Sequence, residues 1–119
     1  MFDVRFLENP HYVDRLQGLT GCDPEVASYI ERDADCPPFF DRLWRLLELV
    51  LPRYENGGKS YLTIAIGCTG GRHRSVYVAE RLTTKLRDAG WQTELAHRDL
   101  SPRPVGGPVA GPANPLAAS

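Results

Sequence analysis

One stretch decides the fold of this chain: Tyr61-Leu-Thr-Ile-Ala-Ile-Gly-Cys-Thr-Gly-Gly-Arg-His-Arg-Ser75. Its apolar first half ends abruptly in a glycine-rich loop, and an amphipathic stretch follows. This order predicts a buried strand, a tight loop and the N-terminus of a helix. At such a junction free backbone N–H groups and the helix dipole converge on an anion. The sequence therefore predicts a binding loop for a phosphate or a carboxylate.

The loop combines backbone freedom with positive charge. Glycines allow a sharp turn and a close approach to a ligand, and Arg72, His73 and Arg74 can neutralise negative charge. Cationic side chains in a first helical turn oppose the helix dipole unless an anion lies between them. A plainer alternative is that the glycines only make a turn, with Cys68 a small buried residue and Arg74 a solvated one. The predicted anion-binding residues of the loop are Cys68, Thr69, Gly70, Gly71, Arg72, His73, Arg74 and Ser75.

The spacing within the loop separates three kinds of phosphate site. No lysine follows the glycines, so the Walker pattern is absent, and the glycines do not fit G-x-G-x-x-G. The spacing C-x5-R-S, formed by Cys68, Arg74 and Ser75, resembles the loop of cysteine-dependent phosphatases. There a thiolate attacks phosphorus and the arginine holds the oxygens. Gly67 stands where those enzymes usually carry histidine, and no aspartate can be assigned as a general acid.

The rest of the chain predicts an α/β fold. Apolar and polar residues alternate in Phe2–Leu7 and Trp91–His97, which indicates two more strands. Helices are expected after Asp23-Pro24, from about Phe40 to Pro52, and after the glycine loop until Gly90. Strand, helix and strand at this spacing form a βαβ unit. We therefore predict a three-layer sandwich in which a small, mostly parallel sheet of Phe2–Leu7, Tyr61–Gly67 and Trp91–His97 carries helices on its faces.

Length and composition limit the possibilities. The chain has 119 residues, which suits one core. Its 14 Lys+Arg nearly balance 15 Asp+Glu, so no overall basic field indicates nucleic acid. Three cysteines without C-x-x-C spacing argue against disulfides and against a zinc site. Without a membrane-length apolar run or a signal peptide, a cytoplasmic location is expected. The predicted domain covers residues 1–100, and the Pro, Gly and Ala-rich residues 101–119 are expected to be disordered.

A second group of polar residues lies near the N-terminus. Asp3 and Arg5 share one side of the first predicted strand, and the polar turn Asn9-Pro10-His11 follows it. In an open parallel sheet, ligands bind beyond the carboxyl ends of the strands. If this strand runs parallel to Tyr61–Gly67, these residues reach the edge that carries the glycine loop. We expect Asp3, Arg5, Asn9 and His11 to complete the site there.

Several of these segments together resemble one family. The chain is similar from Phe2 to about Arg98 to the C-terminal domain of the RapZ (YvcJ-type) proteins. The segments that carry the resemblance are Phe2-Asp-Val-Arg-Phe-Leu7, Asn9-Pro-His-Tyr12, Leu19-Thr-Gly21 and Tyr61-Leu-Thr-Ile-Ala-Ile-Gly-Cys-Thr-Gly-Gly-Arg-His-Arg-Ser-Val-Tyr77.

The resemblance implies a regulatory role. In that family an N-terminal P-loop NTPase domain normally precedes this one, and enterobacterial members bind small RNAs and an amino-sugar phosphate, form homo-oligomers and act as ribonuclease adaptors. By resemblance, Cys68, Thr69, Gly70, Gly71, His73 and Arg74 form an anion pocket together with Asp3, Arg5 and His11. This chain begins at the C-terminal domain and lacks the Walker lysine, so nucleotide hydrolysis by the family's usual route is not expected.

Three functions follow as hypotheses. The first is a non-catalytic regulatory module that binds a phosphorylated metabolite, either an amino-sugar phosphate or a nucleotide-like molecule. The partners considered for this module are a small RNA and an NTPase or ribonuclease that acts in trans. The second is a phosphatase in which Cys68 and Arg74 are catalytic. The third is an RNA-binding protein whose anion pocket holds the backbone. No cofactor, metal or membrane partner is expected. The chain is expected to form a homo-oligomer.

Overall fold

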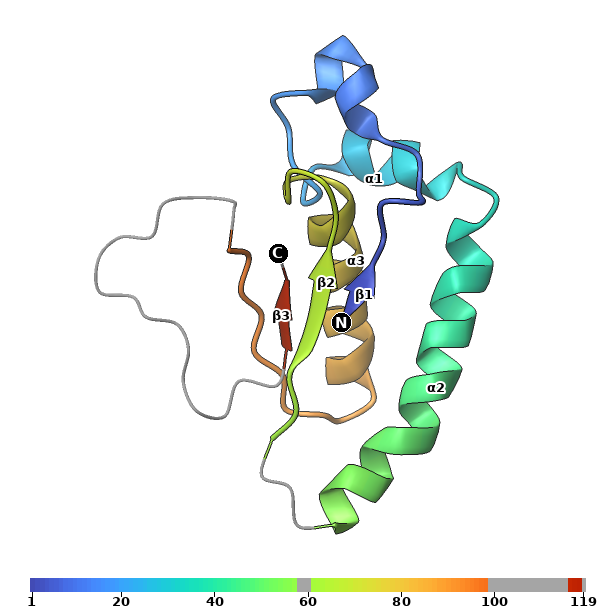
Figure 1. Cartoon of the computed structure of the whole chain (residues 1–119), viewed down its shortest axis with the longest axis vertical. Helices are drawn as coiled ribbons and strands as arrows, with labels where there is room; N and C mark the ends of the chain where they lie inside the picture. Colours follow the sequence, from blue (N-terminus) through green and yellow to red (C-terminus); the bar gives the residue numbers. More distant parts are fainter. Residues whose placement is uncertain (58–60, 99–115, 119) are drawn as a thin grey trace, which may run out of the picture.

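The computed structural model describes residues 1–57, 61–98 and 116–118. Figure 1 shows a small sheet with helices packed beside it. In chain order the elements are β1 (Phe2–Asp3), the 3-10 helices η1 (Pro10–Tyr12) and η2 (Asp14–Leu16), α1 (Pro24–Glu31), α2 (Cys36–Asn56), β2 (Ile64–Gly67), α3 (Arg74–Asp88) and β3 (Leu116–Ala118).

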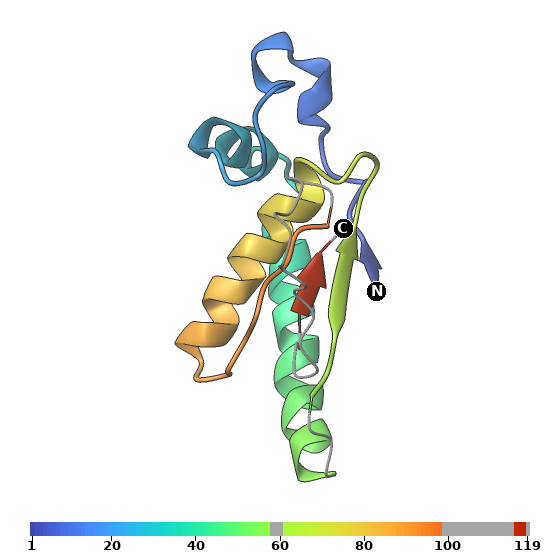
Figure 2. The same cartoon turned by 90° about the vertical axis from the view of Figure 1, so that its left-hand side faces the viewer.

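The sheet is parallel, with β2 in the middle of the order β1-β2-β3. Phe2 lies opposite Ile66 and Asp3 opposite Gly67, while Ile64 lies opposite Leu116. The predicted small α/β fold with a parallel sheet is therefore confirmed. Figure 2 shows α2 and α3 on the same side of the sheet, so among the described residues only one of the two expected helical layers is seen.

The first strand is shorter than the sequence predicts. Instead of continuing to Leu7, it ends at Asp3, whose carboxylate accepts the backbone N–H of Arg5 at 3.0 Å. Such a bond closes an Asx turn, which competes with an extended backbone. Val4 and Leu7 are nevertheless buried and Phe6 is exposed. The alternating pattern therefore predicted burial correctly at Val4 but not at Phe6 or Leu7, because the backbone turns after Asp3.

The predicted strand Trp91–His97 is wrong as a member of the sheet. Its middle is fixed to α3, because the guanidinium of Arg87 donates to the Thr93 carbonyl at 3.2 and 2.9 Å. The edge of β2 is instead taken by β3, which falls within the segment that the sequence predicts to be disordered. The disorder of residues 101–119 stays a prediction. Leu116–Ala118 pair with β2, and such ladder bonds need only main-chain groups and no side-chain periodicity. Residues 99–115 and 119 lie outside the described part of the chain.

Helix α2 extends past both predicted ends. Pro37 and Pro38 lie in its first turn, where a missing N–H removes no helical bond. Pro52 lies inside α2 and does not end it. Phe40, Leu47 and other residues at helical spacing bury this helix against the core, which outweighs the bond that Pro52 cannot make.

Helix α3 forms the centre of the core. Val78, Ala79 and Leu82 are at most 1% exposed and pack with Ile64 and Ile66 of β2. The start of α1 is as predicted, with Asp23 before Pro24. No described helix combines the length and apolarity that crossing a membrane requires.

The end of α3 provides a test of backbone strain. Gly90 follows the helix with φ +95°, and Trp91 N–H donates to the Leu86 carbonyl at 3.0 Å, as the predicted glycine cap requires. Gly90→Ala should lower the free energy of unfolding by about 1–2 kcal/mol, because an added Cβ meets no atom but disfavours this φ. Gly18→Ala, which is also free of contacts and has no positive φ, is the matched control in urea unfolding. Equal effects of the two substitutions would contradict this account of the cap.

Candidate anion-binding site

The glycine loop joins the end of β2 to the start of α3. In Figure 1 it lies at the same edge of the sheet as the segment after β1, as the parallel pairing of β1 and β2 requires. Gly70 and Gly71 have φ of +86° and +67°, which other residues rarely adopt. An added Cβ on Gly70 would meet no atom within 4 Å. Glycine is needed here for the turn, which leaves open space beside the backbone.

Cys68 and Ser75 close the two ends of the loop on each other. The backbone N–H of Ser75, in the first turn of α3, donates to Cys68 Sγ at 3.3 Å. The Cys68 Sγ and Ser75 Oγ atoms are also 3.3 Å apart. Ser75 is fully buried and Cys68 partly so. The cysteine therefore uses one of the N–H groups that begin the helix, and it fixes the diameter of the loop.

The three cationic or titratable side chains of the loop all reach backbone carbonyls of the N-terminal segment. Arg72 Nη2 donates to Gly18 O at 3.3 Å, and His73 Nε2 contacts Leu16 O at 3.1 Å. Arg74 Nη1 donates to the carbonyls of Arg5 and Leu7. The sequence predicts that these side chains serve an anion. Each of them also ties the glycine loop to residues 5–18.

Arg74 is the most buried of these side chains, with 4% of its surface exposed. Its Nη1 donates at 2.5 Å to Arg5 O and at 3.2 Å to Leu7 O. A guanidinium has five N–H donors in a rigid fork. The bonds to these two carbonyls account for Nη1, and Nη2 and Nε offer three further donors.

His73 is buried and electrically neutral. Because a carbonyl only accepts, Nε2 carries the hydrogen in its contact with Leu16. Burial lowers the pKa of His73 below its ordinary value, the hydrogen bonds to the Leu16 and Leu19 carbonyls raise it, and the charges of Arg72 and His11 lower it again. Burial is the largest of these causes.

The predicted N-terminal residues are more solvated than those of the loop. Arg5 Nε and Asp3 Oδ2 form an ion pair at 2.9 Å with 69% and 46% of their side chains exposed, so the pair contributes little to stability. Asn9 Oδ1 accepts the His11 N–H at 3.0 Å and caps η1. The His11 side chain is exposed and, among the described residues, makes no hydrogen bond to the loop. These four residues share the edge of the sheet with the loop, and none of them is hydrogen-bonded to Thr69 or Gly70.

Backbone donors remain available in the middle of the loop. Within the described ranges, Thr69, Gly70 and Gly71 make no hydrogen bond, and Thr69 and Gly70 are exposed. Unpaired N–H groups in successive residues next to a helix N-terminus form the concave arrangement that binds anions. The loop can therefore offer an anion backbone donors as well as side chains.

Gly21 has a structural role that the sequence analysis, which names it only as part of the family segment Leu19-Thr-Gly21, did not assign. Its N–H donates to the Arg72 carbonyl at 2.8 Å. A Cβ here would lie 2.3 Å from Tyr77 N and 2.4 Å from His73 O, so only glycine fits against the first turn of α3. A lone glycine before a predicted helix does not predict such a contact, because the residues it packs against lie far along the chain.

The comparison with known families covers almost the whole described domain. The model of the RapZ C-terminal domain matches residues 1–101. The chain belongs to the RapZ C-terminal domain family. The resemblance drawn from the sequence is thereby confirmed.

Relatives of this RapZ C-terminal domain are named nucleotide-binding proteins. One from Rhodospirillum rubrum is 58% identical over 104 residues, which is 87% of this chain and 33% of the relative. One from Paramagnetospirillum magneticum is 56% identical over 103 residues, 87% of this chain and 34% of the relative. One from Acidiphilium cryptum is 50% identical over 107 residues, 90% of this chain and 35% of the relative. The chain thus spans about a third of the length of these relatives.

The buried His73 should make the RapZ domain sensitive to acid. The pKa of such a histidine is lower in the folded state than in the unfolded state, where it is about 6.5. Above pH 6.5 the histidine does not reduce the free energy of unfolding, and this free energy falls as the pH drops from 6.5 toward the pKa of the folded state. The free energy of unfolding should therefore fall less between pH 7 and pH 5 in His73→Gln than in the wild type. His11→Gln is the control, and a similar reduction of the pH dependence in it would contradict the assignment to His73.

Proposed function

We propose that this chain is a non-catalytic regulatory module that binds a phosphorylated metabolite at the glycine loop. The observation that carries the proposal is the run of unpaired backbone N–H groups from Thr69 to Gly71 before α3, in which Thr69 and Gly70 are exposed. Backbone donors and the helix dipole favour a phosphate group at such a place. The name that the relatives carry, nucleotide-binding protein, agrees with a phosphorylated ligand.

The cationic side chains support the same site in a second way. Because Arg74 Nη1 is held by carbonyls, its guanidinium is fixed in place before a ligand arrives. A fixed donor loses little conformational entropy on binding. In this proposal Arg74 offers its remaining N–H groups to the anion, Arg72 supplies charge beside it, and Ser75 and Cys68 hold the shape of the loop.

The polar turn after β1 would contact the part of the ligand beyond the phosphate. His11 follows β1 and so lies at the edge of the sheet that carries the loop. Asn9 orders the turn, while Arg5 and Asp3 lie directly before it. A sugar or base attached to the phosphate would extend toward these residues. This arrangement supports a metabolite larger than inorganic phosphate.

A cysteine phosphatase is the second candidate. It is favoured by the contact of Ser75 N–H with Cys68 Sγ, which would stabilise a thiolate at the helix N-terminus. Against it, Arg74 Nη1 is directed to carbonyls outside the loop, so a bidentate grip on phosphate by both terminal nitrogens needs a rearrangement. A burst of product from a phosphate ester that is lost in Cys68→Ser would establish this candidate and overturn the non-catalytic proposal.

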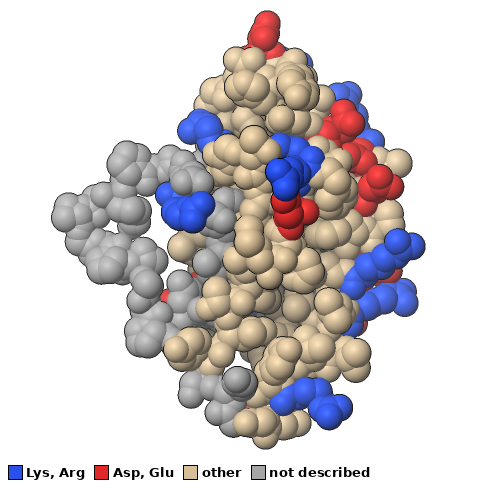
Figure 3. Space-filling model, in the orientation of Figure 1, with Lys and Arg blue, Asp and Glu red and all other residues tan. Residues whose placement is uncertain are grey.

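RNA binding is the third candidate, and it needs a basic surface next to the loop. On the face in Figure 3 the Lys and Arg side chains are scattered and stand beside acidic ones. RNA binding through the phosphate backbone would show a steep loss of affinity with salt. The small-RNA, NTPase and ribonuclease partners, the homo-oligomer and the cytoplasmic location remain predictions.

The loop can be tested with a pair of glycine variants. Inorganic sulfate or phosphate should raise the free energy of unfolding of the wild type, by about 2.7 kcal/mol at one hundred times the Kd. Gly70→Ala should lose this stabilisation, because the substitution distorts the backbone donors at φ +86°. Gly90→Ala, with similar strain far from the loop, should keep it. Loss of the anion effect in both variants, or in neither, would contradict the proposed site.

The polar turn can be tested by comparing two ligands. His11→Ala should weaken the binding of an amino-sugar phosphate at least about fivefold and leave sulfate binding unchanged, since an unpaired polar group on a bound ligand costs about 1–3 kcal/mol. Tyr12→Ala, in the same turn and 81% exposed, is the control. Isothermal titration with both ligands provides the measurement. An equal effect of His11→Ala on both ligands would separate this turn from the rest of the site.

A further inference from the structure

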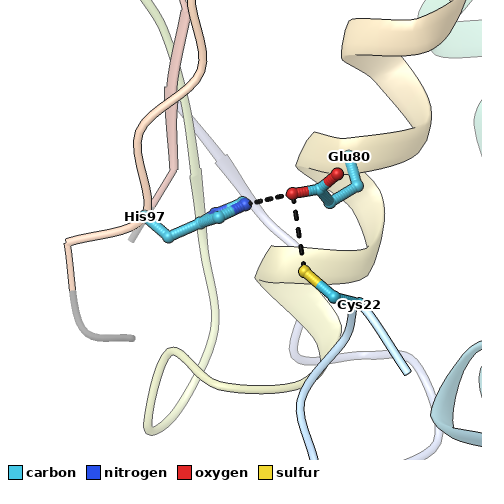
Figure 4. A group of neighbouring side chains, drawn as sticks. All are labelled: Cys22, Glu80 and His97. Carbon is cyan, nitrogen blue, oxygen red and sulfur yellow. Dashed lines mark hydrogen bonds and ion pairs between the residues drawn. The ribbon is translucent and has the colours of Figure 1, made fainter. Parts of the chain in front are cut away.

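Three potential metal ligands meet away from the glycine loop. Figure 4 shows Cys22, Glu80 of α3 and His97 directed toward one another. His97 Nε2 lies 2.7 Å from Glu80 Oε2, and the Cys22 thiol donates to the same oxygen at 3.5 Å. The three ligand atoms all lie within 4.8 Å of one another. Sulfur, nitrogen and oxygen donors from three separate parts of the chain thus converge on one point.

Each of these side chains is positioned by independent contacts of the backbone. Cys22 follows Gly21, which is locked against the first turn of α3, and the Cys22 N–H donates to Thr20 Oγ1 at 3.2 Å. Glu80 lies within α3. The segment that ends at His97 is tied to the same helix through the bonds of Arg87 to the Thr93 carbonyl. The cluster is therefore held by the fold as well as by its own hydrogen bonds.

The order of the three groups excludes a nucleophile activated by histidine. In such a site the imidazole contacts the thiol and the carboxylate orients the imidazole. Here the carboxylate of Glu80 lies between the thiol and the imidazole and contacts both. Three donors arranged around a shared centre are instead typical of ligation.

We propose that Cys22, Glu80 and His97 bind a divalent transition metal, with zinc as the ion that fits best, at a site distinct from the glycine loop. Thiolate, imidazole and carboxylate are the three ligand types that zinc takes in proteins. Three protein ligands leave a fourth position of the tetrahedron for water or another small ligand. Glu80 has 42% of its side chain exposed and Cys22 is exposed, so an ion can enter from solvent.

The distances need only small adjustments. A tetrahedral zinc with ordinary bond lengths separates its nitrogen and oxygen ligands by about 3.3 Å, and its sulfur and oxygen ligands by about 3.6 Å. The corresponding distances here are 2.7 Å and 3.5 Å. Bringing Cys22 Sγ and His97 Nε2 from within 4.8 Å to about 3.6 Å is within the reach of side-chain rotation.

Burial raises the pKa of Cys22, and the negative charge of Glu80 raises it further. A divalent cation would have to displace the proton of this thiol, because thiolate is the ligand. His97 Nδ1 is buried and has no hydrogen-bond partner among the described residues, so the polar contact of this ring is made by Nε2.

Cobalt reports the site directly, because a cobalt–thiolate bond gives a charge-transfer band in the near ultraviolet. Adding Co²⁺ to the reduced chain should produce this band, and Zn²⁺ should abolish it by displacement. Cys22→Ser should lose the band. Glu80→Gln and His97→Gln should each weaken the affinity for Zn²⁺ at least about tenfold, as measured by competition with a chromophoric chelator. A tenfold loss is the low end of the effect seen when a residue that only hydrogen-bonds to a metal ligand is replaced.

Two variants control for binding elsewhere. Cys68→Ser removes another partly exposed thiol, and Glu48→Gln removes an exposed carboxylate on α2. Both should keep the cobalt band and the affinity for Zn²⁺, with circular dichroism confirming that every variant is folded. The proposal is overturned if the wild type gives no band, or if the band persists in Cys22→Ser and is lost in Cys68→Ser.

Discussion

The bonds from Arg74 to the carbonyls of Arg5 and Leu7 are the constraint on which the rest of this structure depends. A buried guanidinium is costly unless polar groups surround it, and the turn after β1 supplies those groups. The same turn directs η1 and η2 over the glycine loop, where Leu16 and Gly18 accept from His73 and Arg72. One cationic run thereby joins two segments that lie far apart in the sequence.

This arrangement changes how the loop can recognise an anion. Side chains bound to carbonyls hold the loop in one shape, and the unpaired backbone N–H groups of Thr69 to Gly71 are the donors that the proposal assigns to the ligand. Recognition by a rigid backbone needs less reorganisation than recognition by flexible arginines. It also explains why a chain with a formal net charge of −1 can carry a site for negative charge. The positive potential is local, and it comes from the helix terminus together with fixed guanidinium groups.

Local chemistry made much of the fold predictable. The strand, loop and helix around Gly67, the start of α1 at Pro24 and the cap at Gly90 each follow from residue types that act on their own neighbours. The parallel direction of β1 and β2 agrees with the predicted, mostly parallel sheet, whereas the order of the strands was not predicted. The prediction that proved wrong, Trp91–His97 as a sheet strand, concerns which segment takes the edge of β2. That choice depends on packing between distant segments.

The same distinction applies to the sites. The residues of the glycine loop could be selected from sequence because they are contiguous, although the carbonyl partners of Arg72, His73 and Arg74 could not. The contacts of Gly21 and the cluster of Cys22, Glu80 and His97 could not be predicted from sequence, because their members come together only when α3 packs. The absence of ligand spacing in the sequence argued against zinc, yet separate segments supply the proposed ligands. Spacing rules detect only sites built within one segment.

The central claim is that the backbone of the glycine loop holds the anion while Arg74 stays on its carbonyls. A crystal structure of the chain with bound amino-sugar phosphate tests it most directly. The account predicts a phosphate group within hydrogen-bond distance of the Thr69, Gly70 and Gly71 N–H groups, with Arg74 Nη1 still bonded to Arg5 and Leu7. A phosphate bound elsewhere, or an Arg74 that has left both carbonyls to grip it, would contradict the account.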